Sequence, residues 1–254
     1  MNLSFNDYIS MWEDIVWSLW KHRANINVEG GRVYLFFATP GMGKSLLLLT
    51  LAYHIAKYNK HLKPKDPNKR LTVLYITQEN SLKETISRLW NIAISDDNII
   101  NFDFQEVKEA FRQAGLFTDD NTSINIKLQY IPHKQLTVDD MYGKIEEMSD
   151  NNEEVIAVIH DYTKRLKNTY PTGDPRIDLG EIINEWQSFA KYFGIPVITA
   201  GQINRNGQTI IEDAVQNNQE DIGKKLNAHN IGESFLLYEN TDYAYIITRE
   251  MKAS

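Results

Sequence analysis

Short apolar runs alternate along the chain with longer segments in which apolar residues recur at three- and four-residue steps. Such runs are typical of buried strands, and the longer spacing is typical of amphipathic helices. The alternation predicts βαβ units and an α/β fold with a mostly parallel sheet and helices on both faces. The predicted strands are 32–38, 71–77, 124–131, 155–159, 195–200 and 243–248, and the predicted helices are 44–58, 81–94, 104–114, 138–148 and 179–192.

Other segments do not follow this alternation. Residues 1–29 carry an aromatic-rich amphipathic helix, which we set apart from a single domain at 30–254. A polar loop is expected at 162–178. Residues 203–232 are polar with little periodicity, and a structureless stretch of that length inside a compact domain is usually functional or mobile.

Composition and charge narrow the classes of function. The chain has 254 residues and no cysteine, which excludes disulfides, thiolate catalysis and cysteine-ligated zinc. Its formal net charge of −7 argues against a polybasic nucleic-acid binder, so any contact with nucleic acid must come from a local basic patch or from oligomerisation. Apolar runs stay below the ~18 residues of a spanning helix, and the N-terminus does not read as a signal peptide. We therefore expect a protein of a bacterial or phage-infected host cytoplasm, without a membrane partner.

The strongest motif is the sequence ATPGMGKS at residues 38–45, which follows a predicted strand and opens a predicted helix. Glycines let the backbone curl so that successive N–H groups point at a phosphate, and the helix N-terminus adds a favourable dipole. Lys44 can reach the β- and γ-phosphates, and the Ser45 hydroxyl can ligate Mg²⁺. We expect a nucleotide to be bound by Pro40, Gly41, Met42, Gly43, Lys44, Ser45 and Leu46.

Three polar residues follow other predicted strands and complete a candidate hydrolytic site. Asp161 stands at the carboxyl end of strand 155–159, where it could hold Mg²⁺ through water or simply cap a turn. Glu79 follows strand 71–77 and could polarise an attacking water or be a surface acid near a helix start. Gln202 follows strand 195–200 and could sense the γ-phosphate or be an ordinary loop residue. His160, beside Asp161, could tune that acid, although we expect it to be a structural residue.

These motifs together resemble those of the DnaB-type replicative helicases, phage versions included. The matching segments are ATPGMGKS at 38–45, LYITQEN at 74–80, IHDY at 159–162, PVITAGQINR at 196–205 and the region from IGES at 231–234 to residues 246–247. The resemblance covers the RecA-like motor domain of that family. It implies a RecA-like P-loop NTPase fold, ATP hydrolysis at subunit interfaces, a hexameric ring and translocation on single-stranded DNA. A primase or a helicase loader would be a further partner.

The resemblance also assigns roles to individual residues. It gives Lys44 and Ser45 to the phosphates and magnesium, Asp161 to the metal, Glu79 to the catalytic base and Gln202 to γ-phosphate sensing. Its DNA-binding loops fall at 162–178 and 203–232. The basic residues expected to contact DNA there are Lys164, Arg165, Lys167, Arg205, Lys224 and Lys225.

Some features depart from the family pattern or leave alternatives open. His160 stands where the family has an aliphatic residue, and the family's basic fingers lie beyond strand 243–248, where only Arg249 and Lys252 remain. We therefore expect either a truncated motor or one that borrows its finger. The N-terminal helix would be a linker that docks on a neighbouring subunit, or a cover for its own sheet. Two other classes share most of these motifs: a RecA-like recombinase or mediator, and a non-translocating regulatory P-loop ATPase.

Overall fold

The computed structural model describes residues 28–94, 104–113, 123–217, 226 and 235–247. The strands are β1 (Val33–Ala38), β2 (Arg70–Thr77), β3 (Asn125–Tyr130), β4 (Glu153–Asp161), β5 (Val197–Gln202) and β6 (Tyr243–Ile246). The helices are α2 (Lys44–Tyr58), α3 (Leu82–Ile94), α4 (Phe104–Gln113), α5 (Val138–Asp150), the 3₁₀ turn η1 (Thr163–Arg165), α6 (Pro175–Phe193), α7 (Arg205–Gln216) and α8 (Phe235–Glu239). The predicted N-terminal helix, Lys224 and Lys225 lie outside the described residues.

The described strands form one six-stranded sheet in the order β3-β2-β4-β5-β1-β6. Every neighbouring pair runs parallel, which confirms the predicted parallel sheet. Because all strands point the same way, their carboxyl ends meet at one edge, where ligands bind in open α/β sheets. The loops after β1, β2, β4 and β5 therefore converge on the same edge, and these are the loops that carry the motifs.

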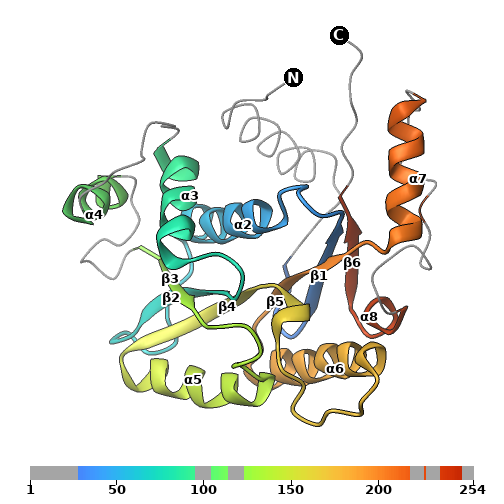
Figure 1. Cartoon of the computed structure of the whole chain (residues 1–254). Coiled ribbons are helices and arrows are strands. Elements are labelled where there is room, and N and C mark those ends of the chain that lie inside the picture. Colours follow the sequence, from blue (N-terminus) through green and yellow to red (C-terminus); the bar gives the residue numbers. More distant parts are fainter. Residues whose placement is uncertain (1–27, 95–103, 114–122, 218–225, 227–234, 248–254) are drawn as a thin grey trace.

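Helices cover both faces of the sheet, with α2 and α3 on one side and α5 and α6 on the other (Figure 1). The two core clusters correspond to these two faces. Along β1, Tyr34 and Phe36 join the cluster beneath α2, while Leu35 and Phe37 join the cluster beneath α6. The strands are apolar on both faces because both faces are covered, which is why they appear in the sequence as continuous apolar runs.

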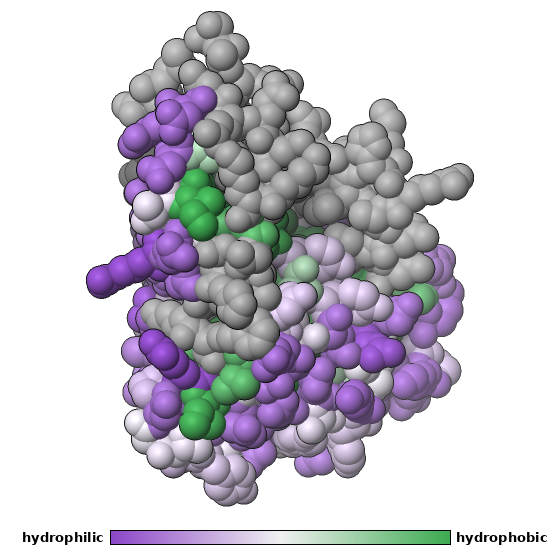
Figure 2. Space-filling view, turned by 90° about the vertical axis from the view of Figure 1, so that its right-hand side faces the viewer, coloured by the Kyte–Doolittle hydropathy of each residue, from purple (hydrophilic) through white to green (hydrophobic). Residues whose placement is uncertain are grey.

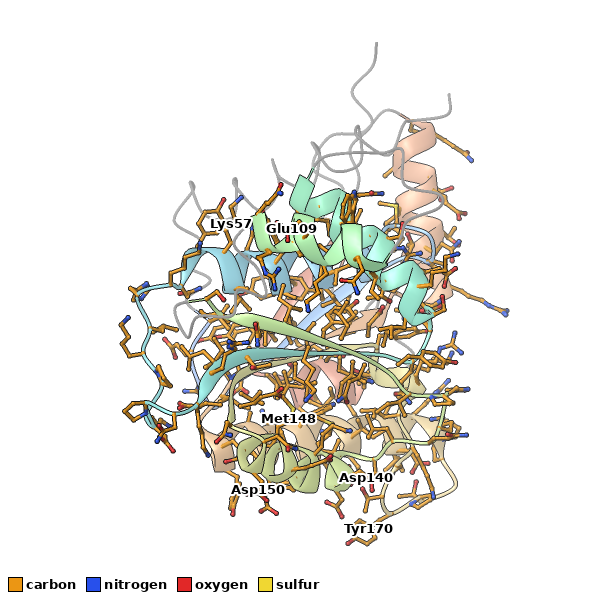
Figure 3. All side chains as sticks on the ribbon, turned by 90° about the vertical axis from the view of Figure 1, so that its left-hand side faces the viewer. Lys57, Glu109, Asp140, Met148, Asp150 and Tyr170 are labelled. Carbon is orange, nitrogen blue, oxygen red and sulfur yellow. The ribbon has the colours of Figure 1, made fainter. Side chains whose placement is uncertain are left out.

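Helix ends follow local chemistry that the sequence already indicates. Ser81 and Glu84 form the reciprocal bonds of a capping box at the start of α3, as their spacing predicts. Thr137 and Asp140 form a second capping box at the start of α5. On α5, Met148 is buried between the helix and the sheet, and Asp140 and Asp150 lie toward its two ends (Figure 3).

Several boundaries differ from the prediction. Helix α6 starts at Pro175, within the predicted polar loop, because the Asp174 side chain accepts a bond from the Arg176 N–H and proline suits the first turn. The prediction that 203–232 lacks structure is wrong for α7, which buries Ile211 and Ala214. The short helix α8 was not predicted, because five residues are too few to show a helical period.

The surface on the side of α7 and α8 is mostly hydrophilic where it is described, and apolar residues show there as small separate patches (Figure 2). Within the ranges that the structure describes, no helix combines the length and the hydropathy needed to cross a membrane.

Candidate nucleotide-binding site

The loop between β1 and α2 has the backbone shape of a phosphate cradle. Gly41 and Gly43 adopt φ values of 76° and 80°, a left-handed conformation that favours glycine. The Met42 N–H donates to the Thr39 carbonyl at 3.3 Å, which closes the turn. Gly43 caps α2 without a side chain, and the first turn of α2 carries no acidic residue. The open N–H groups and the positive end of the helix dipole therefore suit an anion.

Lys44 lies folded back over this loop. Its Nζ donates to the Thr39 carbonyl at 3.3 Å and stands 5.9 Å from the centre of the Tyr162 ring. Burial lowers the pKa of Lys44, while the charges of Glu79 and Asp161 act in the opposite direction. The ammonium group thus has a neutral oxygen as its hydrogen-bond acceptor, and an anionic oxygen would be a stronger one.

Four polar side chains meet at the ends of β2 and β4. Asp161 is fully buried, and its Oδ2 accepts from the Tyr75 hydroxyl and the Asn80 amide, each at 3.3 Å. The same Asn80 amide lies 3.2 Å from the Ser45 hydroxyl oxygen. Burial is the main cause that raises the pKa of Asp161, and the nearby charge of Glu79 raises it further. The carboxylate is therefore held in place but incompletely compensated.

The residues at this point fit a magnesium ion. Asp161 Oδ1 is buried and has no hydrogen-bond partner among the described residues. A buried carboxylate oxygen beside a hydroxyl supplies the hard oxygen donors that Mg²⁺ prefers. Ser45 and Asp161 are thus the residues that would hold the ion. Sequence reasoning did not identify Tyr75 and Asn80 as positioning Asp161, because these contacts join residues 86 and 81 positions apart.

Glu79 lies just beyond β2 and is partly exposed. Its Oε1 meets Nη2 of Arg165 at 3.3 Å, with side-chain exposures of 40% for Glu79 and 31% for Arg165. The Arg165 guanidinium also stands 5.5 Å from the centre of the Tyr162 ring. The structure therefore places an expected DNA contact directly against the expected catalytic base, which sequence spacing did not indicate.

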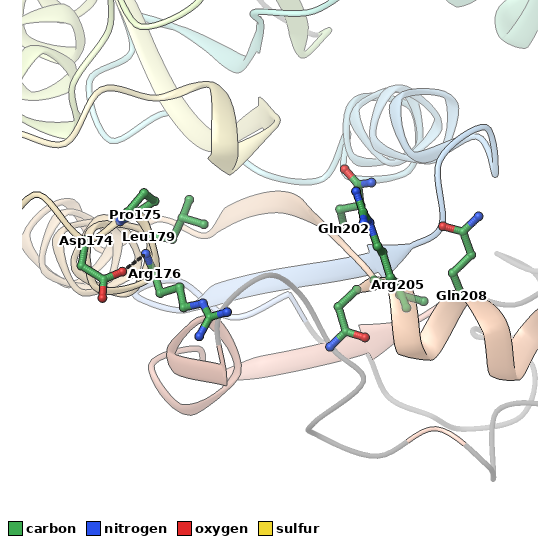
Figure 4. A pocket seen from close by; sticks show the side chains of 9 residues that line it. Asp174, Pro175, Arg176, Leu179, Gln202, Arg205 and Gln208 are labelled. Atoms are coloured by element: carbon green, nitrogen blue, oxygen red, sulfur yellow. Dashed lines mark hydrogen bonds between the residues drawn. The ribbon is translucent and has the colours of Figure 1, made fainter.

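Gln202 is the last residue of β5 rather than a loop residue, and it stands opposite Ala38 in the sheet register. It lines a hollow of about 610 Å³ between the start of α6 and the start of α7. Arg176 reaches into this hollow from α6, and Arg205 and Gln202 lie along the opposite wall (Figure 4). Gln202 thus connects the start of the phosphate loop with a hollow that carries two arginines.

His160 is a buried structural residue. Its Nε2 lies 2.9 Å from the Gln78 Oε1, and its ring stands 6.0 Å from that of Trp186. Burial lowers the pKa of His160 to about 3, so the ring is neutral at pH 7. The structural interpretation of the sequence is confirmed.

A second set of basic residues was missed by sequence reasoning. The loop after β3 carries His133 and Lys134, which line a hollow of about 420 Å³ together with Lys164 and Lys167. The Lys134 N–H donates to the Arg165 carbonyl at 2.9 Å, so the loops after β3 and β4 are joined. The missed signal is the position of His133 and Lys134, at the carboxyl end of a predicted strand.

Comparisons with known proteins identify relatives of this chain. The family described as DnaB-like helicase C terminal domain matches residues 27–214. A probable replicative DNA helicase of Guillardia theta is 21% identical over 185 residues, which cover 71% of this chain and 28% of that protein. The replicative DNA helicase DnaB of Mycoplasma genitalium is 26% identical over 184 residues, which cover 69% of this chain and 36% of that protein. The chain spans about a third of the length of these curated relatives.

Solved structures support the same fold. A DnaB-like replicative helicase, described with its interactions with primase, superposes with a TM-score of 0.61 at 17% identity, covering 88% of this chain and 49% of that one. The ATPase domain of G40P superposes with a TM-score of 0.60 at 15% identity, covering 93% of this chain and 83% of that one. These similarities confirm the predicted RecA-like fold. Because the family match extends over most of the chain, the chain belongs to the DnaB-like helicase C-terminal domain family.

Proposed function

We propose that this chain is the ATP-hydrolysing motor of a DNA helicase that moves along single-stranded DNA. One observation carries the proposal: the start of α2 (Lys44, Ser45), the segment after β2 (Glu79) and the end of β4 (Asp161) converge on one edge of the sheet. Asp161 also keeps a buried oxygen without a partner among the described residues. Membership of the helicase family supports the same conclusion.

The proposed roles follow from these positions. The N–H groups of the loop from Pro40 to Leu46 cradle the phosphates, and Lys44 exchanges the Thr39 carbonyl for a phosphate oxygen. Ser45 and Asp161 would hold Mg²⁺, which supplies neutralisation of phosphate charge when it is bound. Glu79 orients and deprotonates the attacking water, a role that suits a carboxylate just outside the buried cluster.

Gln202 is proposed to sense the γ-phosphate. Its Cα is the register partner of the Ala38 Cα, at the first residue of the phosphate loop, and the residue is followed immediately by the turn into α7. A change in its hydrogen bonding would therefore reach the hollow that Arg176 and Arg205 line. That route connects the nucleotide with a surface suited to an anionic strand.

Single-stranded DNA is the proposed strand along which the motor moves. Lys164 and Lys167 are exposed on the loop after β4, and Arg205 is exposed at the start of α7. Lys224 and Lys225 are proposed contacts outside the described residues. Repeated around a ring, such loops would give a basic lining to an otherwise acidic protein, and backbone phosphates are the strand's main source of affinity.

Assembly and partners are proposed on the same basis. We expect a ring, six-membered by the family pattern, with ATP at subunit interfaces and a segment around residues 1–29 that links neighbours. A relative of known structure is described with primase, which makes a primase a reasonable partner for this chain as well. The cytoplasm of a bacterium or of a phage-infected host is the expected site of action.

The test is ATP hydrolysis by the full chain with and without single-stranded DNA, together with mass determination in the presence of a non-hydrolysable ATP analogue. The proposal predicts DNA-stimulated turnover and closed rings. Filaments would favour a recombinase, and nucleotide binding with turnover that DNA does not change would favour a regulatory ATPase.

A further inference from the structure

Arg165 belongs to two groups of residues at once. It lies between Lys164 and Lys167 on the loop after β4, where these exposed lysines form a basic surface with Lys134 and line a hollow together with His133. Unlike those residues, it also forms an ion pair with Glu79, which the proposed function makes the catalytic base. The contact spans 86 positions in sequence, so the fold of the two loops creates it.

The ion pair between Glu79 and Arg165 is weak enough for the guanidinium to exchange one anionic partner for another. One guanidinium nitrogen meets one carboxylate oxygen at 3.3 Å, and the buried Nε of Arg165 has no hydrogen-bond partner among the described residues. Both side chains are partly exposed, so water screens the attraction. A guanidinium binds a phosphate at least as well as a carboxylate, often through two parallel bonds.

Hydrogen bonds hold the backbone of Arg165 in place, while its side chain can reach either Glu79 or a phosphate. Its N–H donates to the Tyr162 carbonyl at 2.9 Å, and its own carbonyl accepts from the Lys134 N–H at 2.9 Å. A change of partner therefore needs only side-chain rotation, with no movement of the loop. The neighbouring lysines would bring a strand's phosphates within its reach.

We propose that Arg165 is a positioning residue shared between Glu79 and a phosphate of the DNA backbone. Without a strand, the guanidinium holds Glu79. When a strand occupies the basic surface, a phosphate takes the guanidinium and Glu79 is released toward the nucleotide. This inference rests on the proposed function, and it adds a specific connection between the DNA track and the hydrolytic site.

DNA binding and breakage of the Glu79–Arg165 pair are thermodynamically linked, so their coupling can be measured without ATP hydrolysis. If DNA must break the Glu79–Arg165 pair, removing Glu79's charge must strengthen DNA binding, and only where Arg165 is present. The experiment measures binding of a fluorescein-labelled 20-mer of deoxythymidine by anisotropy, without nucleotide, over a series of salt concentrations. The full chain is compared as wild type, Glu79→Gln, Arg165→Gln and the double variant.

We expect Glu79→Gln to bind the oligonucleotide about two- to five-fold more tightly, the factor that corresponds to an exposed ion pair. The same change in the Arg165→Gln background should leave affinity unaltered. Arg165→Gln alone should weaken binding and reduce the salt slope by about 0.7, the loss of one phosphate contact on a single strand. Arg112→Gln, which breaks a comparable ion pair with Glu109 on α4, is the matched control and should change nothing.

Two results would overturn the inference. An equal effect of Glu79→Gln in both backgrounds would mean that Glu79 acts only through general repulsion of the strand. An Arg165→Gln variant with wild-type affinity would mean that Arg165 never meets a phosphate. Failure of the proposed function gives a different pattern: the wild type would not bind the oligonucleotide, or Glu79→Gln would hydrolyse ATP at the wild-type rate.

Discussion

The two edges of the sheet hold their carboxylates differently. At the amino-terminal edge, the carboxylates have partners near the surface: Lys127 meets Glu153 at 2.9 Å, and Glu154 accepts from the Lys65 backbone N–H at 2.7 Å. At the carboxyl edge, Asp161 is buried with one oxygen that has no partner among the described residues, and Lys44 donates to a backbone carbonyl.

A hollow in the surface does not distinguish the carboxyl edge from the amino-terminal edge, because the amino-terminal edge also has one, of about 510 Å³. What differs is the charge of the buried oxygen that has no partner among the described residues: it belongs to the Asp161 carboxylate at the carboxyl edge, and to the neutral Asn125 amide at the amino-terminal edge. An uncompensated buried charge costs far more stability than a neutral polar atom, so the Asp161 carboxylate, beside Ser45 and Lys44, marks a site arranged for a ligand rather than for the fold. If this contrast holds, substitutions at the carboxyl edge should change nucleotide chemistry, and matched substitutions at the amino-terminal edge should not.

Glu79→Gln should lower the rate of ATP hydrolysis by about 10²–10⁴-fold, the usual contribution of a general base. ATP binding should remain, because Glu79 lies outside the cluster of Ser45 and Asp161. Steady-state turnover and equilibrium nucleotide binding separate the two effects. Glu153→Gln, at the opposite edge, is the control, and normal turnover in the Glu79 variant would place the base elsewhere.

Lys44→Ala should weaken ATP binding by about 100-fold, because it removes the ammonium charge that lies over the phosphate loop. Fluorescence titration with a labelled ATP analogue measures this loss. Lys127→Ala removes a lysine that is paired at the other edge, and it should leave nucleotide affinity unchanged. Wild-type affinity in the Lys44 variant would contradict its assignment to the phosphates.

Replacing Lys164 and Lys167 together by glutamine should reduce single-strand affinity and lower the salt slope by about 1.4, since each phosphate contact contributes about 0.7. Both side chains are exposed beside the hollow that His133 and Lys134 line, so the fold should tolerate the change. Binding to an oligonucleotide at several salt concentrations gives the slope. A slope equal to that of wild type would move the DNA track to other residues.

Asp161→Asn should stabilise the ligand-free chain by about 1 kcal/mol, or about 2–4 °C in melting temperature. Burial raises the pKa of Asp161, so the folded state binds this proton more tightly than the unfolded state does. The ionised form is therefore destabilising at pH 7, and the gain from asparagine should shrink as the pH falls through the raised pKa.

Thermal melts in a chelator at pH 7 and pH 4.5 measure that gain. Glu153→Gln should have the opposite sign and a smaller size, since a partly exposed ion pair near the surface contributes under about 1 kcal/mol. Destabilisation of the Asp161 variant at pH 7 would show that the carboxylate is compensated in the ligand-free chain.

Much of the fold could be predicted from apolar pattern and local chemistry. The strands could be predicted because both faces of the sheet are covered, so each strand is a continuous apolar run in the sequence. The larger helices could be predicted from their apolar spacing. The start of α3 was found because Ser81 and Glu84 interact within one turn. Helix α7 was missed because polar residues dominate its first turn, although Asn204 caps it through the Gly207 N–H at 2.9 Å.

The candidate site was predictable only in part, for a physical reason. Lys44 and Ser45 belong to one local motif, so their proximity follows from sequence. The contacts of Asn80 with Ser45 and Asp161, and of Arg165 with Glu79, join separate loops. Such contacts depend on strand order and loop path, which no local pattern encodes.

We propose that the carboxyl edge of the sheet holds Lys44, Ser45 and the buried Asp161 carboxylate for a nucleotide and its magnesium ion. The decisive measurement is isothermal titration calorimetry of the full chain with a non-hydrolysable ATP analogue, once with Mg²⁺ and once with a chelator. We predict binding that is clearly tighter with Mg²⁺, and about 100-fold weaker in Lys44→Ala under both conditions. Absence of binding, or equal affinity with and without Mg²⁺, would contradict the account.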